Sequence, residues 1–287
     1  MPARRTGATY PGRMSHLVSA AELSELIERE PRLRILDVRW RLDRPDGRPE
    51  HRAGHIPGAV YVDLDTELSR HGALDEGRHP IPTTDALQAA ARRWGLHDGD
   101  PVVVYDDASG LPAARAWWLL RQGGVDVRVL DGGWRVWQAA GGAVETGERM
   151  PQPGDITLTD VSTNGIDIEE AAAFPASGVL LDVRAPERYR GETEPMDPAA
   201  GHIPGAVNLP TTVHLREDGM LRSAEEIRTA LAEAGIDQDA PIAAYCGSGV
   251  TAAHTALALA EAGIDAKIFH GSWSAWSNTP GRPVATG

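Results

Sequence analysis

The chain has 287 residues but only one cysteine, Cys246. A single cysteine excludes an internal disulfide, and it also excludes a second thiol in the chain that could resolve a modified Cys246. No stretch approaches the roughly 18 consecutive apolar residues of a membrane-spanning helix. Residues 1–14 carry arginines but no apolar segment of the kind found in secretion signals. We therefore expect a cytoplasmic protein that receives any second sulfur from another molecule.

Basic residues are also scarce relative to acidic ones. There are 28 lysines and arginines against 41 aspartates and glutamates, which gives a net charge of −13. Such a balance argues against nucleic acids and anionic membrane surfaces as main partners. An anionic substrate would need a locally positive pocket. The hydrophobic content of 41% is typical of a soluble globular chain, and the length allows one large or two ordinary domains.

Cys246 stands in the segment Tyr-Cys-Gly-Ser-Gly-Val-Thr, residues 245–251. The residues before it, 241–245, predict a short buried strand, and residues 251–262 predict an alanine-rich helix. Gly247 and Gly249 allow the connecting loop to curl and point N–H groups at the sulfur, and the small Ser248, Val250 and Thr251 leave its mouth open. With the positive end of the following helix, these donors favour the thiolate. We expect a nucleophilic cysteine rather than a merely buried one, although burial is the commoner fate of a free cysteine.

Two other kinds of site use similar parts. A cysteine-dependent phosphatase needs an arginine that closes the loop around phosphate, but Ala252 and Ala253 follow Thr251. A dinucleotide-binding loop fits Gly247-x-Gly249-x-x-Ala252 loosely. Its acidic partner should end the next strand, whereas Asp265 precedes that strand. Both interpretations are therefore disfavoured.

The chain repeats itself. Three segments recur in the same order, namely 35–39, 54–60 and 132–137, which return as 180–184, 201–207 and 271–276. The offset drifts from 145 to 139 residues, as expected for diverged copies with small insertions. A period of this length indicates duplicated domains rather than a solenoid.

Each copy alternates short apolar runs with helical stretches, for example 101–105, 111–122 and 126–130. This order predicts an α/β fold in which each copy is a parallel sheet with helices on both faces. We place the first domain at 15–140, a linker rich in glycine and proline at 141–160, and the second domain at 161–287. Ligands of such sheets bind beyond the carboxyl ends of the strands, where Cys246 falls.

Alignment of residues 101–106 with residues 241–246 puts Asp106 at the position of Cys246. An aspartate cannot be a sulfur nucleophile. We therefore expect the first copy to have kept the fold and lost the chemistry.

The sequence His-Ile-Pro-Gly-Ala in both halves, together with Cys-Gly-Ser-Gly-Val-Thr only in the second, resembles the two-domain rhodanese superfamily of sulfurtransferases. The resemblance extends from about residue 18 to residue 284. It implies two rhodanese-like domains, an inactive first one packed on a catalytic second one, with Cys246 passing through a persulfide. It implies no cofactor.

Within the superfamily, the neutral loop after Cys246 resembles that of the 3-mercaptopyruvate sulfurtransferases, since thiosulfate-using members often carry basic residues there. Arg188 corresponds to the arginine that binds the donor carboxylate, with Arg190 close by, and a planar guanidinium suits that task. The alternative for Arg188 is a solvated surface charge. The chain departs from the pattern after Glu194-Pro195, where Met196-Asp197 replace an expected second arginine. Thiosulfate therefore stays open as the donor.

The resemblance implies transfer of the outer persulfide sulfur to cyanide, a small thiol or a reduced protein thiol. Gly247, Ser248, Gly249, Val250 and Thr251 are the expected substrate-binding loop, with Ser248 and Thr251 as hydrogen-bond donors. His55 is expected near Ser248, with Asp46 as its orienting acid. The simpler alternative makes His55, like His202, a structural residue that fixes the Ile-Pro-Gly turn. A second class of function is a sulfur-carrier or binding module without turnover.

Two further features have simple explanations. His51 and His55 have the spacing of a helical zinc site. Because Gly54 and Ile56-Pro57 disfavour a helix there, we expect no metal. The tryptophans are expected in the core, with Trp273 as a candidate to line the pocket.

Overall fold

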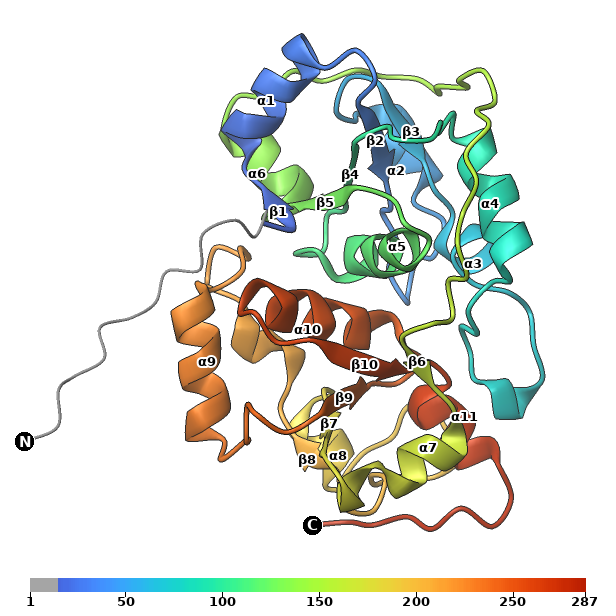
Figure 1. Cartoon of the computed structure of the whole chain (residues 1–287), viewed down its shortest axis with the longest axis vertical. Helices are drawn as coiled ribbons and strands as arrows, with labels where there is room; N and C mark the ends of the chain where they lie inside the picture. Colours follow the sequence, from blue (N-terminus) through green and yellow to red (C-terminus); the bar gives the residue numbers. More distant parts are fainter. Residues whose placement is uncertain (1–14) are drawn as a thin grey trace, which may run out of the picture.

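The structure, a computed structural model, describes residues 15–287, so the expectation for residues 1–14 lies outside the described part. The chain forms two halves of matching topology (Figure 1). The first half contains, in order, β1 (Leu17–Val18), α1 (Ala20–Arg29), β2 (Arg34–Asp37), α2 (Arg48–Ala53), β3 (Ala59–Tyr61), α3 (Leu64–Glu67), η1 (Leu74–Glu76), α4 (Thr84–Arg93), β4 (Val102–Tyr105), α5 (Leu111–Gln122), β5 (Val127–Leu130) and α6 (Gly133–Ala139).

The second half repeats the order of the strands, with η2 added after α7 and with η3 in place of α3 and η1. It contains β6 (Gly165–Ile166), α7 (Ile168–Ala173), η2 (Phe174–Ala176), β7 (Val179–Asp182), α8 (Pro186–Tyr189), β8 (Val207–Asn208), η3 (Thr211–His214), α9 (Ala224–Glu233), β9 (Ile242–Tyr245), α10 (Val250–Glu261), β10 (Ala266–Phe269) and α11 (Ser272–Asn278). Residues 140–164 connect the two halves and include the predicted linker.

Each half has one five-stranded parallel sheet. The strand orders are β1-β5-β4-β2-β3 and β6-β10-β9-β7-β8, so each strand of the first sheet has its counterpart in the second. The prediction of an α/β fold with two parallel sheets is confirmed. Parallel sheets need crossover connections, and helices supply them here.

Both faces of each sheet are covered because alternate strand residues point to opposite sides. In the first sheet, Ile35 and Val103 join a core with α1 and α6, whereas Leu36 and Val104 join the core of α4 and α5. In the second sheet, Leu180 packs toward the tryptophans of α11. The expected burial of the tryptophans is confirmed at Trp117, Trp118, Trp137, Trp273 and Trp276.

The two halves meet through α5 and α10, which lie side by side between the sheets (Figure 1). Both helices are buried along almost their whole length. A helix that is apolar on nearly all sides needs neighbours on all sides. One continuous core therefore runs from the first sheet across these helices to the second.

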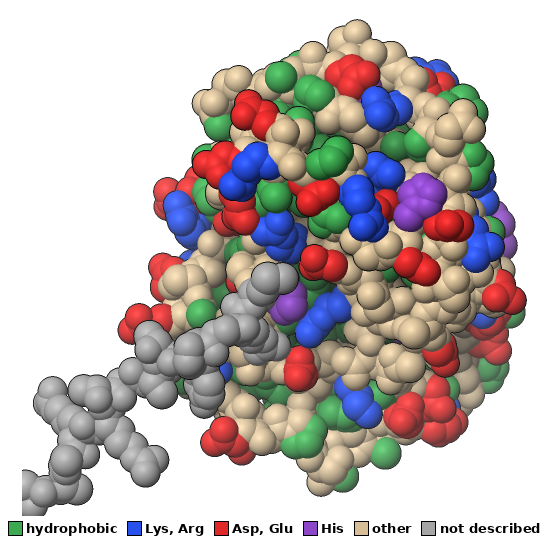
Figure 2. All heavy atoms as spheres, turned by 45° about the horizontal axis from the view of Figure 1, so that its top comes forward, with side chains coloured by type: hydrophobic (Ala, Val, Ile, Leu, Met, Phe, Trp, Pro, Cys, Tyr) green, Lys and Arg blue, Asp and Glu red, His purple; other side chains and the backbone are tan. Residues whose placement is uncertain are grey.

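The connection between the halves also packs against them. Ile156 and Leu158 are buried in the shared core, and the backbone of Glu145 pairs with that of His55. Within residues 15–287, no helix is long and apolar enough to cross a membrane. On the face drawn in Figure 2, acidic and basic side chains are interspersed.

Candidate active site

Cys246 directly follows β9, and α10 begins four residues later. Its side chain is buried, with 3% of the residue exposed. Gly249, at φ +84°, caps α10, and its N–H donates a hydrogen bond to Sγ of Cys246 over 3.1 Å. A left-handed backbone favours glycine, and this glycine also has no room for a side chain, since a Cβ would lie 2.7 Å from the carbonyl oxygen of His270. The predicted curled loop is present, with one N–H aimed at the sulfur.

The loop is tied to the start of α11. The N–H of Cys246 donates to Oγ of Ser272 over 3.2 Å, and the N–H of Trp273 donates to the carbonyl of Cys246 over 3.0 Å. Ser272 has φ +54°, a conformation that costs free energy for a residue with a side chain. Its hydrogen bonds to Cys246 and to the Phe269 carbonyl help to compensate for that strain.

The first half shows what this kind of loop binds. The carboxylate of Asp106 accepts hydrogen bonds from the N–H groups of Ala108, Gly110 and Ala113, at 2.8, 2.9 and 2.8 Å. Burial raises the pKa of Asp106 to about 6, against the lowering effect of these donors. The corresponding loop of the first half thus directs three N–H donors at a side chain of its own. In the second half, this type of cradle is offered to the sulfur of Cys246.

A cavity of about 430 Å³ opens above Cys246. Cys246, Gly247, Thr251 and Arg188 all line it, so the structure brings these predicted residues together. The guanidinium of Arg188 is fixed by Glu194, with Nη2 2.7 Å from Oε1. Its Nη1 lies 3.5 Å from the position that a Cβ on Gly247 would take. The arginine is therefore oriented by an acid on one side and faces the cysteine loop on the other.

A second arginine reaches the same glycine from the first half. Nη2 of Arg78 lies 3.2 Å from the Cβ position of Gly247, and Nη1 forms an ion pair with Asp197. Asp197 is the residue that breaks the expected pattern after Glu194-Pro195. Burial raises the pKa of Asp197, and the charge of Arg78 opposes this. The second half thus lacks the expected second arginine, and Arg78 of the first half brings a cation to Asp197 instead.

Ser248 belongs to a chain of hydrogen bonds that crosses between the halves. Its Oγ lies 2.8 Å from Nδ1 of His79, and Nε2 of His79 lies 3.3 Å from Oδ1 of Asp65. The indole N–H of Trp40 donates to the same carboxylate oxygen over 3.0 Å. The hydrogen bond from His79 lowers the pKa of Asp65. This acid–imidazole–hydroxyl chain can hold or move a proton at the mouth of the loop.

The prediction that His55 reaches Ser248 was wrong, because His79 occupies that place. His55 is buried, stacked on His51, with Nδ1 2.8 Å from the His51 carbonyl oxygen. Burial lowers the pKa of His55. This contact with a backbone carbonyl agrees with the simpler alternative, in which His55 is a structural residue. His202 makes the equivalent contact with the Tyr189 carbonyl, as expected for a turn-fixing residue.

Four further predicted residues do not line the cavity. The carboxylate of Asp46 accepts from the N–H of Arg48, and Asp65 takes the role of orienting acid. Arg190 is exposed and paired with Glu192 rather than turned toward the cavity. Trp273 is fully buried and donates to the Ala199 carbonyl, so it does not line the cavity. Val250 begins α10 and is also buried.

The histidine pair at 51 and 55 is engaged elsewhere. Nδ1 of His51 lies 2.9 Å from the carboxylate of Asp37. The expectation that no helix forms here was wrong, because α2 spans Arg48–Ala53, but His55 lies beyond its end. Among residues 15–287, no group of three or more histidine, cysteine, aspartate or glutamate side chains is arranged to hold a metal ion.

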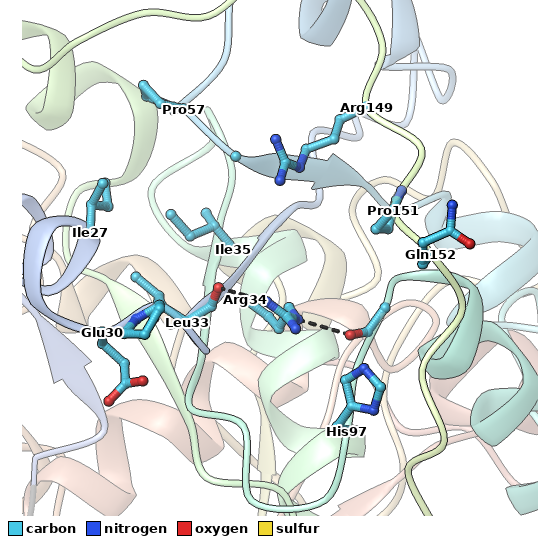
Figure 3. Close-up of a pocket in the computed structure, with 13 residues that line it drawn as sticks. Ile27, Glu30, Leu33, Arg34, Ile35, Pro57, His97, Arg149, Pro151 and Gln152 are labelled. Atoms are coloured by element: carbon cyan, nitrogen blue, oxygen red, sulfur yellow. Dashed lines mark hydrogen bonds between the residues drawn. The ribbon is translucent and has the colours of Figure 1, made fainter.

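Another cavity, of about 400 Å³, lies in the first half (Figure 3). It opens where β2 begins, and Arg34 on its wall is already bound to Asp100 and to the Gly95 carbonyl. In a parallel sheet, ligands bind at the carboxyl ends of strands rather than at this end. The cavity above Cys246 is therefore the better candidate site.

Comparison with known proteins agrees with this geometry. The chain matches the family described as rhodanese-like domain over residues 19–140 and again over 167–279. It is 48% identical over 275 residues to a Mycobacterium tuberculosis protein named "Putative thiosulfate sulfurtransferase SseB", covering 94% of this chain and 97% of that one. It is 36% identical to human 3-mercaptopyruvate sulfurtransferase, covering 91% of each.

A solved structure shows the same arrangement. The crystal structure of the 3-mercaptopyruvate sulfurtransferase SseA from Escherichia coli matches with a TM-score of 0.81 at 32% identity, covering 91% of this chain and 99% of that one. The two matching halves agree with the relatives of full length, which are named sulfurtransferases, and the activity is sulfur transfer. The chain belongs to the rhodanese family and is one of its two-domain sulfurtransferases.

Proposed function

We propose that Cys246 takes sulfur from 3-mercaptopyruvate through a persulfide. The observation that carries this proposal is the position of the thiol on the wall of a cavity shared with Arg188, in a loop whose Gly249 N–H points at the sulfur. The Cys246 thiolate attacks the donor sulfur, an S–S bond forms, and the C–S bond breaks. Its electron pair leaves on pyruvate enolate, which takes up a proton to become pyruvate. Covalent catalysis of this kind divides the transfer into two easier steps.

The donor carboxylate meets Arg188, with Arg78 as the second cation. Both guanidiniums face Gly247, and each is oriented by an acid behind it, Glu194 or Asp197. Charge-assisted hydrogen bonds of this kind are the strong ones. The positive pocket that an acidic protein needs for an anionic donor would thus be built by both halves together.

The Asp65–His79–Ser248 chain serves the departing enolate. In the neutral imidazole with its Nε2–H on Asp65, Nδ1 accepts the hydroxyl proton of Ser248. When His79 takes up the proton of the donor thiol, that bond reverses, and Ser248 is left free to donate to the enolate oxygen. A donor aimed at developing negative charge is among the larger contributions to catalysis. The expected donor role of Ser248 is retained in this proposal, with a different histidine behind it.

The outer sulfur of the persulfide then passes to an acceptor outside the chain, because Cys246 has no partner thiol within it. Cyanide, a small thiol and a reduced protein thiol all have the required nucleophile. Small thiols are kept reduced in the cytoplasm, which is the compartment that this cycle suits.

Thiosulfate is the second candidate donor. The relative at 48% identity is named a putative thiosulfate sulfurtransferase, and two arginines beside Gly247 suit a doubly charged anion. With thiosulfate, the same attack would expel sulfite instead of pyruvate enolate.

The deciding experiment compares the two donors on one enzyme preparation with a small thiol as acceptor. Steady-state release of pyruvate from 3-mercaptopyruvate should exceed release of sulfite from thiosulfate. Faster sulfite release would favour thiosulfate as the donor. A single equivalent of product without turnover, from either donor, would support a sulfur-carrier module and contradict the proposed catalytic cycle.

A further inference from the structure

Arg115 lies on α5 of the first half and is fully buried. Its Nη2 donates to the carbonyl of His79 over 2.9 Å, and its Nε donates to the carbonyl of Leu68 over 3.3 Å. Both acceptors are uncharged. Nη1 has no hydrogen-bond partner among residues 15–287, and no carboxylate in that part of the chain lies within ion-pair distance of this side chain.

The unpaired end of Arg115 lies behind the cysteine loop. Nη1 is 3.3 Å from the position that a Cβ on Gly249 would take, and the N–H of Gly249 is the group that donates to Sγ of Cys246. The guanidinium therefore reaches the loop from the protein interior. It is not among the side chains that line the donor cavity.

Burial lowers the pKa of Arg115 to about 10, and the negative charge of Cys246 opposes this shift. The side chain therefore remains cationic at neutral pH. A buried cation without a counter-ion is strongly unfavourable. An anion within reach would remove much of that cost.

The other ionisable groups around the loop are paired or neutral. Arg78 and Arg188 are held by acids, and His79 lies against Asp65. His270 is partly buried, and desolvation together with the charge of Arg115 lowers its pKa well below the usual value. Arg115 is thus the cation near the loop that lacks a carboxylate within the described residues.

We propose that Arg115, supplied by the half without the reactive cysteine, is the cation that stabilises the Cys246 thiolate and the persulfide anion from behind the loop. The same guanidinium donates to the backbone carbonyl of His79. One side chain therefore links the sulfur of Cys246 to the Asp65–His79–Ser248 chain. The inference rests on the proposed function only in taking Cys246 as the nucleophile.

The test measures the reactivity of Cys246 toward iodoacetamide between pH 5 and 10, without any sulfur donor. Arg115→Gln keeps hydrogen-bond donors and removes the charge, whereas Arg115→Lys keeps a charge and loses the planar fork. The pH midpoint of alkylation should rise by about one unit or more in Arg115→Gln and stay close to wild type in Arg115→Lys. Arg121→Gln, the same change on the same helix, is the control and should leave the midpoint unchanged.

An unchanged midpoint in folded Arg115→Gln would overturn the proposal, and so would equal shifts in the Gln and Lys variants. Because alkylation needs no turnover, these outcomes are independent of which donor the enzyme uses. A rise confined to Arg115→Gln would uphold the proposal even if both donors failed in the activity assay.

If Arg115→Gln does not fold, the proposal is tested by thermal unfolding of wild type and Cys246→Ser at several pH values between 6 and 9. A thiolate that the fold stabilises contributes stability that appears as pH rises. The advantage of wild type over Cys246→Ser should therefore grow toward pH 9. A constant difference would contradict the proposal.

Discussion

At the scale of single residues, two acids orient the arginines that we propose to bind the donor. Glu194 fixes Arg188 through two oxygens, and Asp197 binds Arg78. Each acid holds one edge of a guanidinium, so that another edge faces Gly247. Orientation of this kind reduces the entropy that the arginine loses when it binds a carboxylate.

Substitution of Arg188 by Met should raise KM for 3-mercaptopyruvate by roughly tenfold to a hundredfold, since a hydrogen bond to a charged group contributes about 1.5–3 kcal/mol. KM for an uncharged organic trisulfide should change little. Arg78→Met should give the same pattern with a smaller increase. The matched control is Arg190→Met, because Arg190 is two residues away, exposed and paired with Glu192. Equal effects of Arg188→Met on both donors would argue against carboxylate binding.

At the scale of elements, the same strand–loop–helix unit occurs in both halves with different occupants. In the first half, the loop between β4 and α5 binds the carboxylate of Asp106. In the second, the loop between β9 and α10 binds the sulfur of Cys246. In both halves, N–H groups of the loop point at the side chain that follows the strand, and in the first half burial opposes the anionic form that these donors favour.

The loop after β4 predicts a pH-dependent stability. The pKa of Asp106 is raised to about 6 in the fold, so its protonated form is the favoured one. Asp106 therefore contributes to the free energy of unfolding at low pH, and this contribution is lost as pH rises through about 6. The total change is on the order of 2 to 3 kcal/mol. The advantage of wild type over Asp106→Asn, measured by thermal unfolding, should shrink between pH 4 and 7.5. A difference that grows with pH would contradict this description of the loop.

The loop after β9 depends on the backbone of Gly249. Gly249→Ala adds a Cβ at φ +84° and 2.7 Å from a carbonyl oxygen, so both strain and overlap oppose it. Gly235→Ala is the matched control, because Gly235 has φ +70° and open space around its Cβ position. Chemical denaturation should show a cost of about 1 kcal/mol for Gly235→Ala and about 3 kcal/mol or more for Gly249→Ala. Equal costs would mean that the loop relaxes easily.

At the scale of the whole molecule, the site belongs to neither half alone. Cys246, the proposed nucleophile, comes from the second half together with Arg188 and Ser248, whereas Arg78, His79 and Arg115 come from the first. The shared core around α5 and α10 places the two groups against each other. The half that carries Asp106 at the position of the cysteine therefore also contributes side chains to the candidate site.

Residues 161–287 produced alone should aggregate or remain unfolded. Without the first half, the apolar helix α10 would be exposed to water along the side that α5 covers. Circular dichroism and size-exclusion chromatography would show this directly. A monomeric, folded fragment with normal alkylation of Cys246 would contradict both the role of the shared core and that of Arg115.

The sequence was sufficient for the parts of the molecule that are local or repeated. The internal repeat predicts two parallel sheets, and the glycines beside Cys246 predict its loop. His79, Arg78 and Arg115 carry no comparable signal, because they reach the loop only through packing of one half on the other. The repeated His-Ile-Pro motif indicated His55 instead, whose ring contacts the carbonyl of His51.

The central claim is that Cys246 carries sulfur as a persulfide, and mass spectrometry of the enzyme after a single exposure to 3-mercaptopyruvate tests it most directly. Without an acceptor, wild type should gain one sulfur atom on the peptide that contains Cys246 and release one equivalent of pyruvate. Folded Cys246→Ser should do neither. Release of pyruvate by Cys246→Ser, or an unmodified Cys246 in an enzyme that turns over, would contradict the account.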